Sequence, residues 1–187
     1  MVYNDIIKGY FISLRSVEEN DAEKILKWRT DENISKYLHK TDNDIKKQRE
    51  WIKEQRTREG DYYFLIINSK TNEAVGTIGL YNIDKGKSEG LFGRWICFSP
   101  IYSLESSLLI YKFGFQILNL QRIITQIVDN NLPVINFHKR FGANFVRNVK
   151  DEKSEFTFVE YEILRINYKK IESVQYKILK NFIREDI

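Results

Sequence analysis

The sequence predicts an α/β fold in which helices pack on a mixed sheet. Three observations predict it. Apolar residues at helical spacing dominate residues 18–58, and aromatic, apolar runs between turn residues fill residues 61–98. Strand and helix patterns then alternate as far as residue 141. With 187 residues, two prolines and no Gly/Ser-rich stretch, we expect one continuous domain over residues 1–187.

Four elements are expected in the N-terminal part: a strand at residues 10–14 and helices at residues 18–28, 31–38 and 42–58. The first helix places Ala22, Ile25 and Leu26 on one face, which suits packing on a sheet. The third helix is charged on most sides and keeps Trp51 and Ile52 for packing.

The middle of the chain predicts an antiparallel meander. Residues 61–67 (DYYFLII) are aromatic and apolar but too short for a good helix, which favours a buried strand. Residues 73–81 and 89–98 are predicted to form two more strands. The turn residues SKTNE and the polar segment IDKGKS separate the three strands.

A helix is predicted at residues 104–118, because its apolar residues recur every three or four positions. This stripe comprises Leu104, Leu108, Tyr111, Phe115 and Leu118. The next segment predicts a buried strand at residues 123–128, a polar loop, and a short helix at residues 132–141. Strand ends of this kind open onto ligands in α/β proteins, although a plain helix start with Asn131 as N-cap explains the same residues.

The C-terminal part is expected to hold strands at residues 145–149 and 155–166 and a helix at residues 168–183. The alternation of the two strands is irregular. The inward face of the last helix is predicted to be its apolar stripe, formed by Ile171, Val174, Ile178 and Phe182.

Composition excludes several classes of protein. Thirty Lys/Arg against 26 Asp/Glu give a net charge of +4, which suits a small anionic ligand but falls short of the basic patch of a nucleic-acid-binding protein. A single cysteine excludes an internal disulfide. The sequence shows neither a secretory leader nor a long apolar run, so a cytoplasmic protein without membrane contact is expected. His39 and His138 have no Cys or carboxylate at metal-ligand spacing, so no metal is expected.

Several short strings occur in consistent order over most of residues 9–166. They are Trp28-Arg29-Thr30, VGTIGL from Val75, FGRWICFSP from Phe92, LNLQRI from Leu118, and the pattern of Asn131, Pro133 and Lys139 to Gly142. Together they resemble the GNAT N-acetyltransferase superfamily. The resemblance implies a mixed, mostly antiparallel sheet flanked by helices, with splayed fourth and fifth strands. HKRFG and the short Trp-Arg segment are most similar to the branch that acylates nucleotide-linked amino sugars, and the branch that modifies ribosomal proteins shares the same pattern.

The resemblance also implies the position of the cosubstrate, acetyl-CoA or a longer acyl-CoA. It would bind between strands 89–98 and 123–128, with thioester and acceptor amine side by side. Backbone amides around Trp95, Ile96 and Phe98 would pair with the pantetheine arm. No metal is implied.

The coenzyme pyrophosphate is expected at residues 99–106, where helix N–H groups favour anions. The family pattern there is Q/R-x-x-G-x-G/A, but this chain has no glycine in the segment. We therefore expect the hydroxyls of Ser103 and Ser106 to donate instead, and Glu105 to be unfavourable if it points inward. His138 is expected beside the coenzyme, either contacting its phosphates or packing.

Three residues are candidates for catalysis by resemblance. The usual fourth-strand carboxylate is replaced by Leu91, so Glu89 on the same strand face is the candidate base, with a solvated strand-start carboxylate as the alternative. Asn131 matches the family Asn that contacts the pantetheine arm, with the N-cap as its alternative. Tyr102 is a candidate acid for the departing thiolate, whereas Tyr111 lies on the apolar stripe and is expected in the core.

Trp28 and Arg29 follow a helix that lines the acceptor side in relatives. They are expected to contact the substrate or shape the acyl pocket, and core packing is the alternative for Trp28. Residues 36–58 hold eight Lys/Arg against four Asp/Glu. This segment could meet substrate phosphates, or it could be a solvated, ion-paired helix.

The sequence therefore predicts an N-acyltransferase that moves an acyl group, acetyl or longer such as hydroxybutyryl, from acyl-CoA to the amine of a nucleotide-linked amino-deoxy sugar, as in cell-surface polysaccharide biosynthesis. One alternative is a ribosomal-protein or peptide N-acetyltransferase. A non-catalytic, ligand-binding GNAT homologue is another, because the loop glycines are missing and the carboxylate is displaced. Relatives often dimerise, so a homodimer is one expectation.

Overall fold

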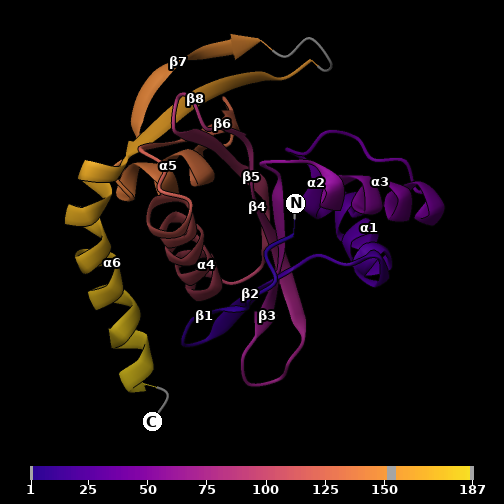
Figure 1. The fold of residues 1–187 in the computed structure, drawn as a ribbon, viewed down its shortest axis with the longest axis horizontal. Coiled ribbons are helices and arrows are strands. Elements are labelled where there is room, and N and C mark those ends of the chain that lie inside the picture. Colours follow the sequence, from indigo (N-terminus) through magenta and orange to yellow (C-terminus); the bar gives the residue numbers. More distant parts are fainter. Residues whose placement is uncertain (1, 151–154, 186–187) are drawn as a thin grey trace.

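The computed structural model describes residues 2–150 and 155–185, which form an eight-stranded sheet with helices on both faces (Figure 1). The strands are β1 (Ile7–Lys8), β2 (Ile12–Ser16), β3 (Tyr62–Asn68), β4 (Ala74–Asp84), β5 (Glu89–Cys97), β6 (Arg122–Val128), β7 (Asn144–Lys150) and β8 (Thr157–Leu164). Their order in the sheet is β1-β2-β3-β4-β5-β6-β8-β7. Every neighbouring pair is antiparallel except β5 and β6, which run parallel.

Helices α1 to α3 cover one face of the sheet and α4 to α6 the other (Figure 1). The helices are α1 (Ala22–Thr30), α2 (Glu32–Ser35), α3 (Ile45–Thr57), α4 (Pro100–Lys112), α5 (Leu132–Arg140) and α6 (Arg165–Glu185), with a 3-10 turn (Glu19–Asp21) before α1 and a π-helical turn (Phe113–Ile117) after α4. Every residue of α4 from Leu104 to Tyr111 is buried. A helix buried on all sides needs partners on all sides, and α4 packs between the sheet and α6. The predicted fold class is confirmed.

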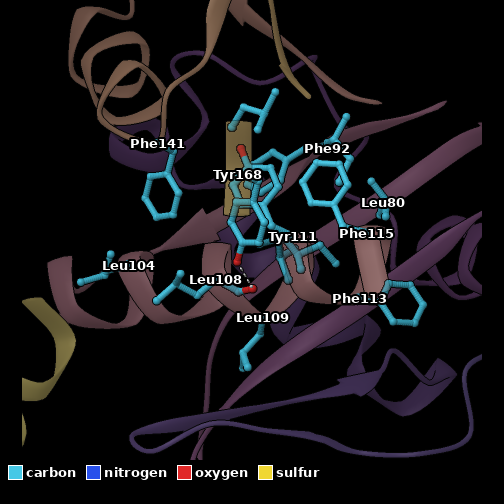
Figure 2. Packing of buried hydrophobic residues seen from close by; sticks show 14 of the residues in the cluster. Leu80, Phe92, Leu104, Leu108, Leu109, Tyr111, Phe113, Phe115, Phe141 and Tyr168 are labelled. Carbon is cyan, nitrogen blue, oxygen red and sulfur yellow. Dashed lines mark hydrogen bonds between the residues drawn. The ribbon is translucent and has the colours of Figure 1, made fainter. Parts of the chain in front are cut away.

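The main core lies between the sheet and α4 (Figure 2). The ring of Tyr111 stacks on Phe92 of β5, with centroids 5.6 Å apart, and lies 5.4 Å from Tyr168 of α6. The Tyr168 hydroxyl donates to the carbonyl of Leu108 at 3.3 Å (Figure 2). These rings tie β5, α4 and α6 together, and the predicted core position of Tyr111 is confirmed.

Several elements begin elsewhere than predicted, among them α1 at Ala22, α3 at Ile45 and α6 at Arg165, which were expected from residues 18, 42 and 168. The first long strand is Ile12–Ser16, two residues later than expected, and the short β1 before it was not predicted. Helix α4 begins at Pro100, because proline suits the first helical turn, whereas the stripe that predicted it starts at Leu104. Most of the segment expected to be a phosphate loop is therefore helix.

Glu105 does not point toward that segment's outer surface. Its carboxylate accepts the backbone N–H groups of Tyr10, Phe11 and Ile12 at 2.5, 2.8 and 2.9 Å. Burial raises the pKa of Glu105, and these N–H groups counteract the rise. A Cβ atom at Gly9 would lie 2.8 Å from the backbone carbonyl oxygen of Ile12 as well as close to the Glu105 carboxylate, so the turn before β2 needs glycine there. Glu105 thus holds the start of β2 against α4.

The prediction for the inward face of the last helix was wrong at three of its four residues, whereas the fourth, Ile171, is half-buried against Gly142. Within α6, Tyr168 and Leu179 are buried, whereas Val174, Ile178 and Phe182 are 52%, 42% and 38% exposed. The Tyr168 hydrogen bond and a second one from Gln175 to the carbonyl of Arg140, at 3.0 Å, fix the rotation of the helix. These two hydrogen bonds, rather than the apolar stripe, therefore determine which face of α6 is buried.

Strands β5 and β6 part along their length. They pair only from Glu89 to Phe92 on β5 and from Arg122 to Thr125 on β6. Beyond these pairs β5 continues to Cys97 and β6 to Val128 without pairing to each other. The predicted splay of the fourth and fifth long strands is confirmed.

Candidate active site

A cleft of about 380 Å³, the donor cleft, opens where β5 and β6 part. Trp95, Ile96 and Phe98 line it from β5 and the residue after it. Asn131 lines it from the loop before α5, and His138 lines it from α5 itself. The structure therefore brings five of the residues expected near the coenzyme to one place.

A β-bulge aims the end of β5 into this cleft. Gly79 pairs with Gly93 and Thr77 with Ile96, so β5 carries one residue more than β4 between these pairs. Arg94 takes the strain with a φ of 50°, and the Thr77 hydroxyl donates to its carbonyl at 2.8 Å. A bulge increases the local twist, which turns the strand end away from β6. The backbone edge of β5 is left facing the cleft.

Asn131 precedes α5 but its side chain makes no capping hydrogen bond. Only its backbone acts at the helix start, where the carbonyl accepts from Ile135 N at 3.1 Å. Asn131 also lines the donor cleft. This geometry favours the role of coenzyme ligand over that of cap.

His138 is 1% exposed, and its Nδ1 lies 3.1 Å from the Tyr111 hydroxyl. Burial lowers the pKa of His138 to about 3, so the ring is neutral near pH 7. Its Nε2 and the Nε1 of Trp95 have no hydrogen-bond partner among the described residues. A neutral, buried imidazole suits packing better than the expected contact with coenzyme phosphates.

The N-terminus of α4 lies after β5, as the expected pyrophosphate site requires. Pro100 has no N–H, and Ser103 N donates to the carbonyl of Ser99 at 2.8 Å. The N–H groups of the two residues between them remain for an anion. Ser103 is partly exposed in this turn, but Ser106 is fully buried and donates to the Ser103 carbonyl at 3.2 Å. The structure places Ser106 in the core, away from any phosphate.

Neither Glu89 nor Tyr102 lines the donor cleft. Glu89 lies at the closed end of the β5–β6 pair, 2.8 Å from Arg122, which also binds Glu162 at 2.5 Å. A cation directly across the strands fixes this carboxylate. The Tyr102 hydroxyl accepts a hydrogen bond from Asn68 at 2.8 Å, at the end of β3. The structure therefore brings neither candidate to the reacting centre.

A second pocket of about 540 Å³, the acceptor pocket, adjoins the donor cleft. Tyr37, Arg94 and Gln126 line both. The aromatic wall of the acceptor pocket and its cations come from many elements: Trp51, Tyr63, Tyr81, Arg29, Lys40, Arg94 and Lys150. Among the residues that the structure describes, no Asp or Glu lines it. The pocket is aromatic and positively charged.

Arg94 stabilises the wall of this pocket but adds no net charge, because it forms an ion pair with Asp61. Its guanidinium binds both oxygens of the buried Asp61, at 2.5 and 3.0 Å, and lies 4.1 Å from the Tyr81 ring centroid. Among the described residues, the positive charge that no carboxylate offsets in this pocket therefore comes from Arg29, Lys40 and Lys150.

Of the two residues expected to bind substrate, Arg29 lines the acceptor pocket and Trp28 lies beside the donor cleft. Arg29 lines the acceptor pocket and holds the loop after α2, since its Nε donates to Thr41 at 2.8 Å. Trp28 lines neither cavity, but its ring packs 5.7 Å from Phe98 at the rim of the donor cleft.

A third pocket of about 510 Å³ lies farther along the same sheet face. It holds the buried Glu160, which binds Gln126 and Arg147. Neither Gln126 nor Glu160 was among the predicted site residues. The alternation of Arg122, Ile124 and Gln126 along β6 is the sequence signal from which the side of the sheet that Gln126 faces could have been predicted.

The acetyltransferase (GNAT) domain profile matches residues 12–144. The chain belongs to the GNAT acetyltransferase family. An uncharacterised N-acetyltransferase, p20, from Bacillus licheniformis is 28% identical over 134 residues, 66% of this chain and 74% of that protein. The resemblance to GNAT enzymes is thereby confirmed.

Two solved structures show what this fold is similar to. FdhC, described as a nucleotide-linked sugar GNAT and solved in its apo form, has a TM-score of 0.78 at 30% identity, covering 94% of this chain and 98% of FdhC. Spermidine N-acetyltransferase from Vibrio cholerae, solved with CoA and spermine, has a TM-score of 0.74 at 17% identity, covering 84% of this chain and 98% of that one. The second likeness concerns the fold alone.

GNAT acetyltransferases use acetyl-CoA, so family membership supports acyl transfer from an acyl-CoA. Over residues 2–150 and 155–185 no group of three or more His, Cys, Asp or Glu could hold a metal. Within the same ranges, no helix has the length and apolarity that crossing a membrane requires.

Proposed function

We propose that this GNAT enzyme transfers an acyl group from acyl-CoA to the amine of a nucleotide-linked amino-deoxy sugar. One observation carries the proposal: the acceptor pocket, aromatic and cationic, opens beside the donor cleft. A nucleotide diphosphate offers a flat base for aromatic side chains and phosphates for Arg29, Lys40 and Lys150. The similarity to FdhC, described as a nucleotide-linked sugar GNAT, supports the same acceptor class.

Charge argues against a cationic acceptor. A peptide amine or a polyamine is positively charged at pH 7 before it reacts, and a cationic pocket repels it. Recognition of such an amine calls for carboxylates, and none lines the acceptor pocket among the described residues. The charge pattern therefore favours an amine carried by an anionic molecule.

The coenzyme would occupy the donor cleft. Its pantetheine amides would pair with the free backbone edge of β5 and with the side chain of Asn131, and its pyrophosphate would bind at the N-terminus of α4. The first turn of α4 offers the N–H groups of Ile101 and Tyr102 and the Ser103 hydroxyl, since Pro100 has no N–H, and without glycine the backbone cannot approach a phosphate as closely. Phosphate binding would thus be weaker than the family loop provides.

Transfer would proceed directly in the ternary complex. The amine nitrogen bonds to the thioester carbon, the carbon–sulfur bond breaks, the nitrogen loses one proton, and the coenzyme thiolate gains one. With Glu89 and Tyr102 outside the cleft, water carries both protons in this proposal.

The test measures free coenzyme A thiol. The protein is incubated with acetyl-CoA or hydroxybutyryl-CoA and with a panel of dTDP- and UDP-amino sugars, then with ribosomal-protein peptides. We expect release with a nucleotide sugar and none with peptides. Release with peptides alone would overturn the acceptor assignment, and calorimetry without acetyl-CoA binding would indicate a non-catalytic homologue.

A further inference from the structure

Gln126 of β6 lies where the three pockets meet. Among the described residues it alone lines the donor cleft, the acceptor pocket and the third pocket. It lies one residue beyond Thr125, the last β6 residue paired with β5, and its side chain is exposed. Its side chain therefore lies where the donor cleft and the acceptor pocket adjoin.

Neighbouring charge fixes the orientation of the Gln126 amide. Its Nε2 donates to Glu160 Oε2 at 3.0 Å. The Glu160 side chain is 4% exposed, and its oxygens also accept from Arg147 at 3.3 and 3.4 Å. An ionised carboxylate only accepts hydrogen bonds, so the NH₂ group of Gln126 must face it. The amide oxygen is turned away, and no described residue donates to it.

We propose that the Gln126 Oε1 accepts an N–H of the substrate amine, and that Glu160 is a positioning residue acting through Gln126. A neutral primary amine has two N–H donors and one lone pair. Holding one N–H on Oε1 constrains where the lone pair points, and the same oxygen stabilises the positive charge that develops on nitrogen during attack. The identity of the amine's carrier rests on the proposed function; the contact with Gln126 does not.

Glu160 is poorly placed to take the proton itself. Both of its oxygens already accept hydrogen bonds, and its side chain is almost fully buried. It lines the third pocket but neither the donor cleft nor the acceptor pocket. The proton therefore leaves through water, as in the direct transfer above.

The test compares Gln126→Met, Glu160→Gln and the double variant with wild type. Methionine keeps the length of glutamine and removes its hydrogen bonds. We expect Gln126→Met to lower kcat about tenfold or more while the Kd for acetyl-CoA stays within about twofold. Glu160→Gln should cost about threefold to tenfold, because the Gln126 amide can then flip. The double variant should be no worse than Gln126→Met alone, since both changes act on one contact.

Gln121→Met is the matched control, because Gln121 is an exposed glutamine next to β6 that lines none of the three pockets. It should keep wild-type kinetics. The proposal is overturned if Gln126→Met stays within about threefold of wild type. It is equally overturned if Glu160→Gln is more damaging than Gln126→Met and removes the acidic limb of the pH profile, which would make Glu160 the base. If nucleotide sugars are not acylated but another amine is, the same variants are measured with that amine, so the two proposals fail separately.

Discussion

The donor cleft and the acceptor pocket lie side by side, yet they are built by different means. The donor cleft is made mainly from two short stretches of chain, the end of β5 and the segment from β6 to α5, which offer backbone edges and apolar walls. Residues around α2 and Phe158 of β8 complete its lining. The acceptor pocket is assembled from side chains far apart in sequence, among them Arg29, Lys40, Trp51 and Lys150. Proteins that share a fold can bind the same ligand where the backbone recognises it. Where loop side chains recognise the ligand, its identity can differ between such proteins without any change of fold.

The sharpest way to break this comparison is to reverse the charge of the acceptor pocket alone. Lys40→Glu combined with Lys150→Glu should lower kcat/KM for the nucleotide sugar about a hundredfold, since each charge-assisted contact to phosphate contributes about 1.5 kcal/mol or more. The Kd for acetyl-CoA, measured by calorimetry, should change less than twofold.

Lys53→Glu combined with Lys177→Glu makes the same change in net charge at exposed positions outside the pocket. This control should retain activity within about threefold, since exposed charges at a distance are screened by salt. Equal losses in the two double variants would show that net charge, not the acceptor pocket, attracts the substrate.

The donor side can be tested through His138, whose burial makes the cleft wall sensitive to acid. The folded-state pKa of about 3 lies below the usual 6.5, so the unfolded state binds more protons between these values. The free energy of unfolding therefore has its full value with respect to this group above about pH 6.5, and it decreases as the pH falls toward 3. For this group the loss reaches about 2 kcal/mol at pH 5.

His138→Gln should remove that loss. Urea unfolding at pH 7 and pH 5 should show a decrease in unfolding free energy about 2 kcal/mol smaller for the variant than for wild type. The matched control, His39→Gln at the exposed histidine, should keep the wild-type difference. If His138→Gln and wild type lose the same stability, the imidazole is not buried neutral in solution.

The same contrast explains how much the sequence predicted. The donor side depends on local order, so the splayed strands and the positions of Trp95, Ile96 and Asn131 followed from short strings. The acceptor pocket depends on tertiary proximity. Nothing local places Lys150 near Lys40, or Glu160 behind Gln126, because sheet order puts β8 between β6 and β7.

The positions of two glutamates could not be predicted from the local sequence, because partners elsewhere in the chain hold their carboxylates. Glu105 was expected to be unfavourable for phosphate binding if it pointed inward, and three backbone N–H groups before and at the start of β2 hold it. Glu89 was the candidate base, with a solvated strand-start carboxylate as the alternative, and the cross-strand partner Arg122 holds it at the closed end of the β5–β6 pair. The partners of both glutamates lie far from them in the sequence, so neither pairing is visible in the local pattern.

A substitution of Asn131 should have a smaller effect, and it distinguishes the role of this residue as helix N-cap from its role as coenzyme ligand. Asn131→Ala should raise the Kd for acetyl-CoA about fivefold, the value of one lost hydrogen bond of about 1 kcal/mol. The free energy of unfolding should stay within about 0.5 kcal/mol, since no capping bond is lost, whereas loss of a true N-cap costs about 1 kcal/mol. Asn130→Ala, at the exposed neighbour, should change neither quantity. Lower stability with unchanged affinity would restore the capping role.

The smallest expected effect is that of Glu89→Gln, which tests whether the closed end of β5 takes part in chemistry. Because Glu89 is held by Arg122 and lies outside the donor cleft, kcat/KM should stay within about threefold of wild type from pH 6 to 9. Arg122 keeps Glu162 as a partner, so little stability should be lost from this partly exposed pair. A loss above about thirtyfold, with the acidic limb of the pH profile gone, would make Glu89 the base. The amine would then approach from the closed end of the strands, and the division between a backbone-built donor side and a side-chain-built acceptor side would no longer hold.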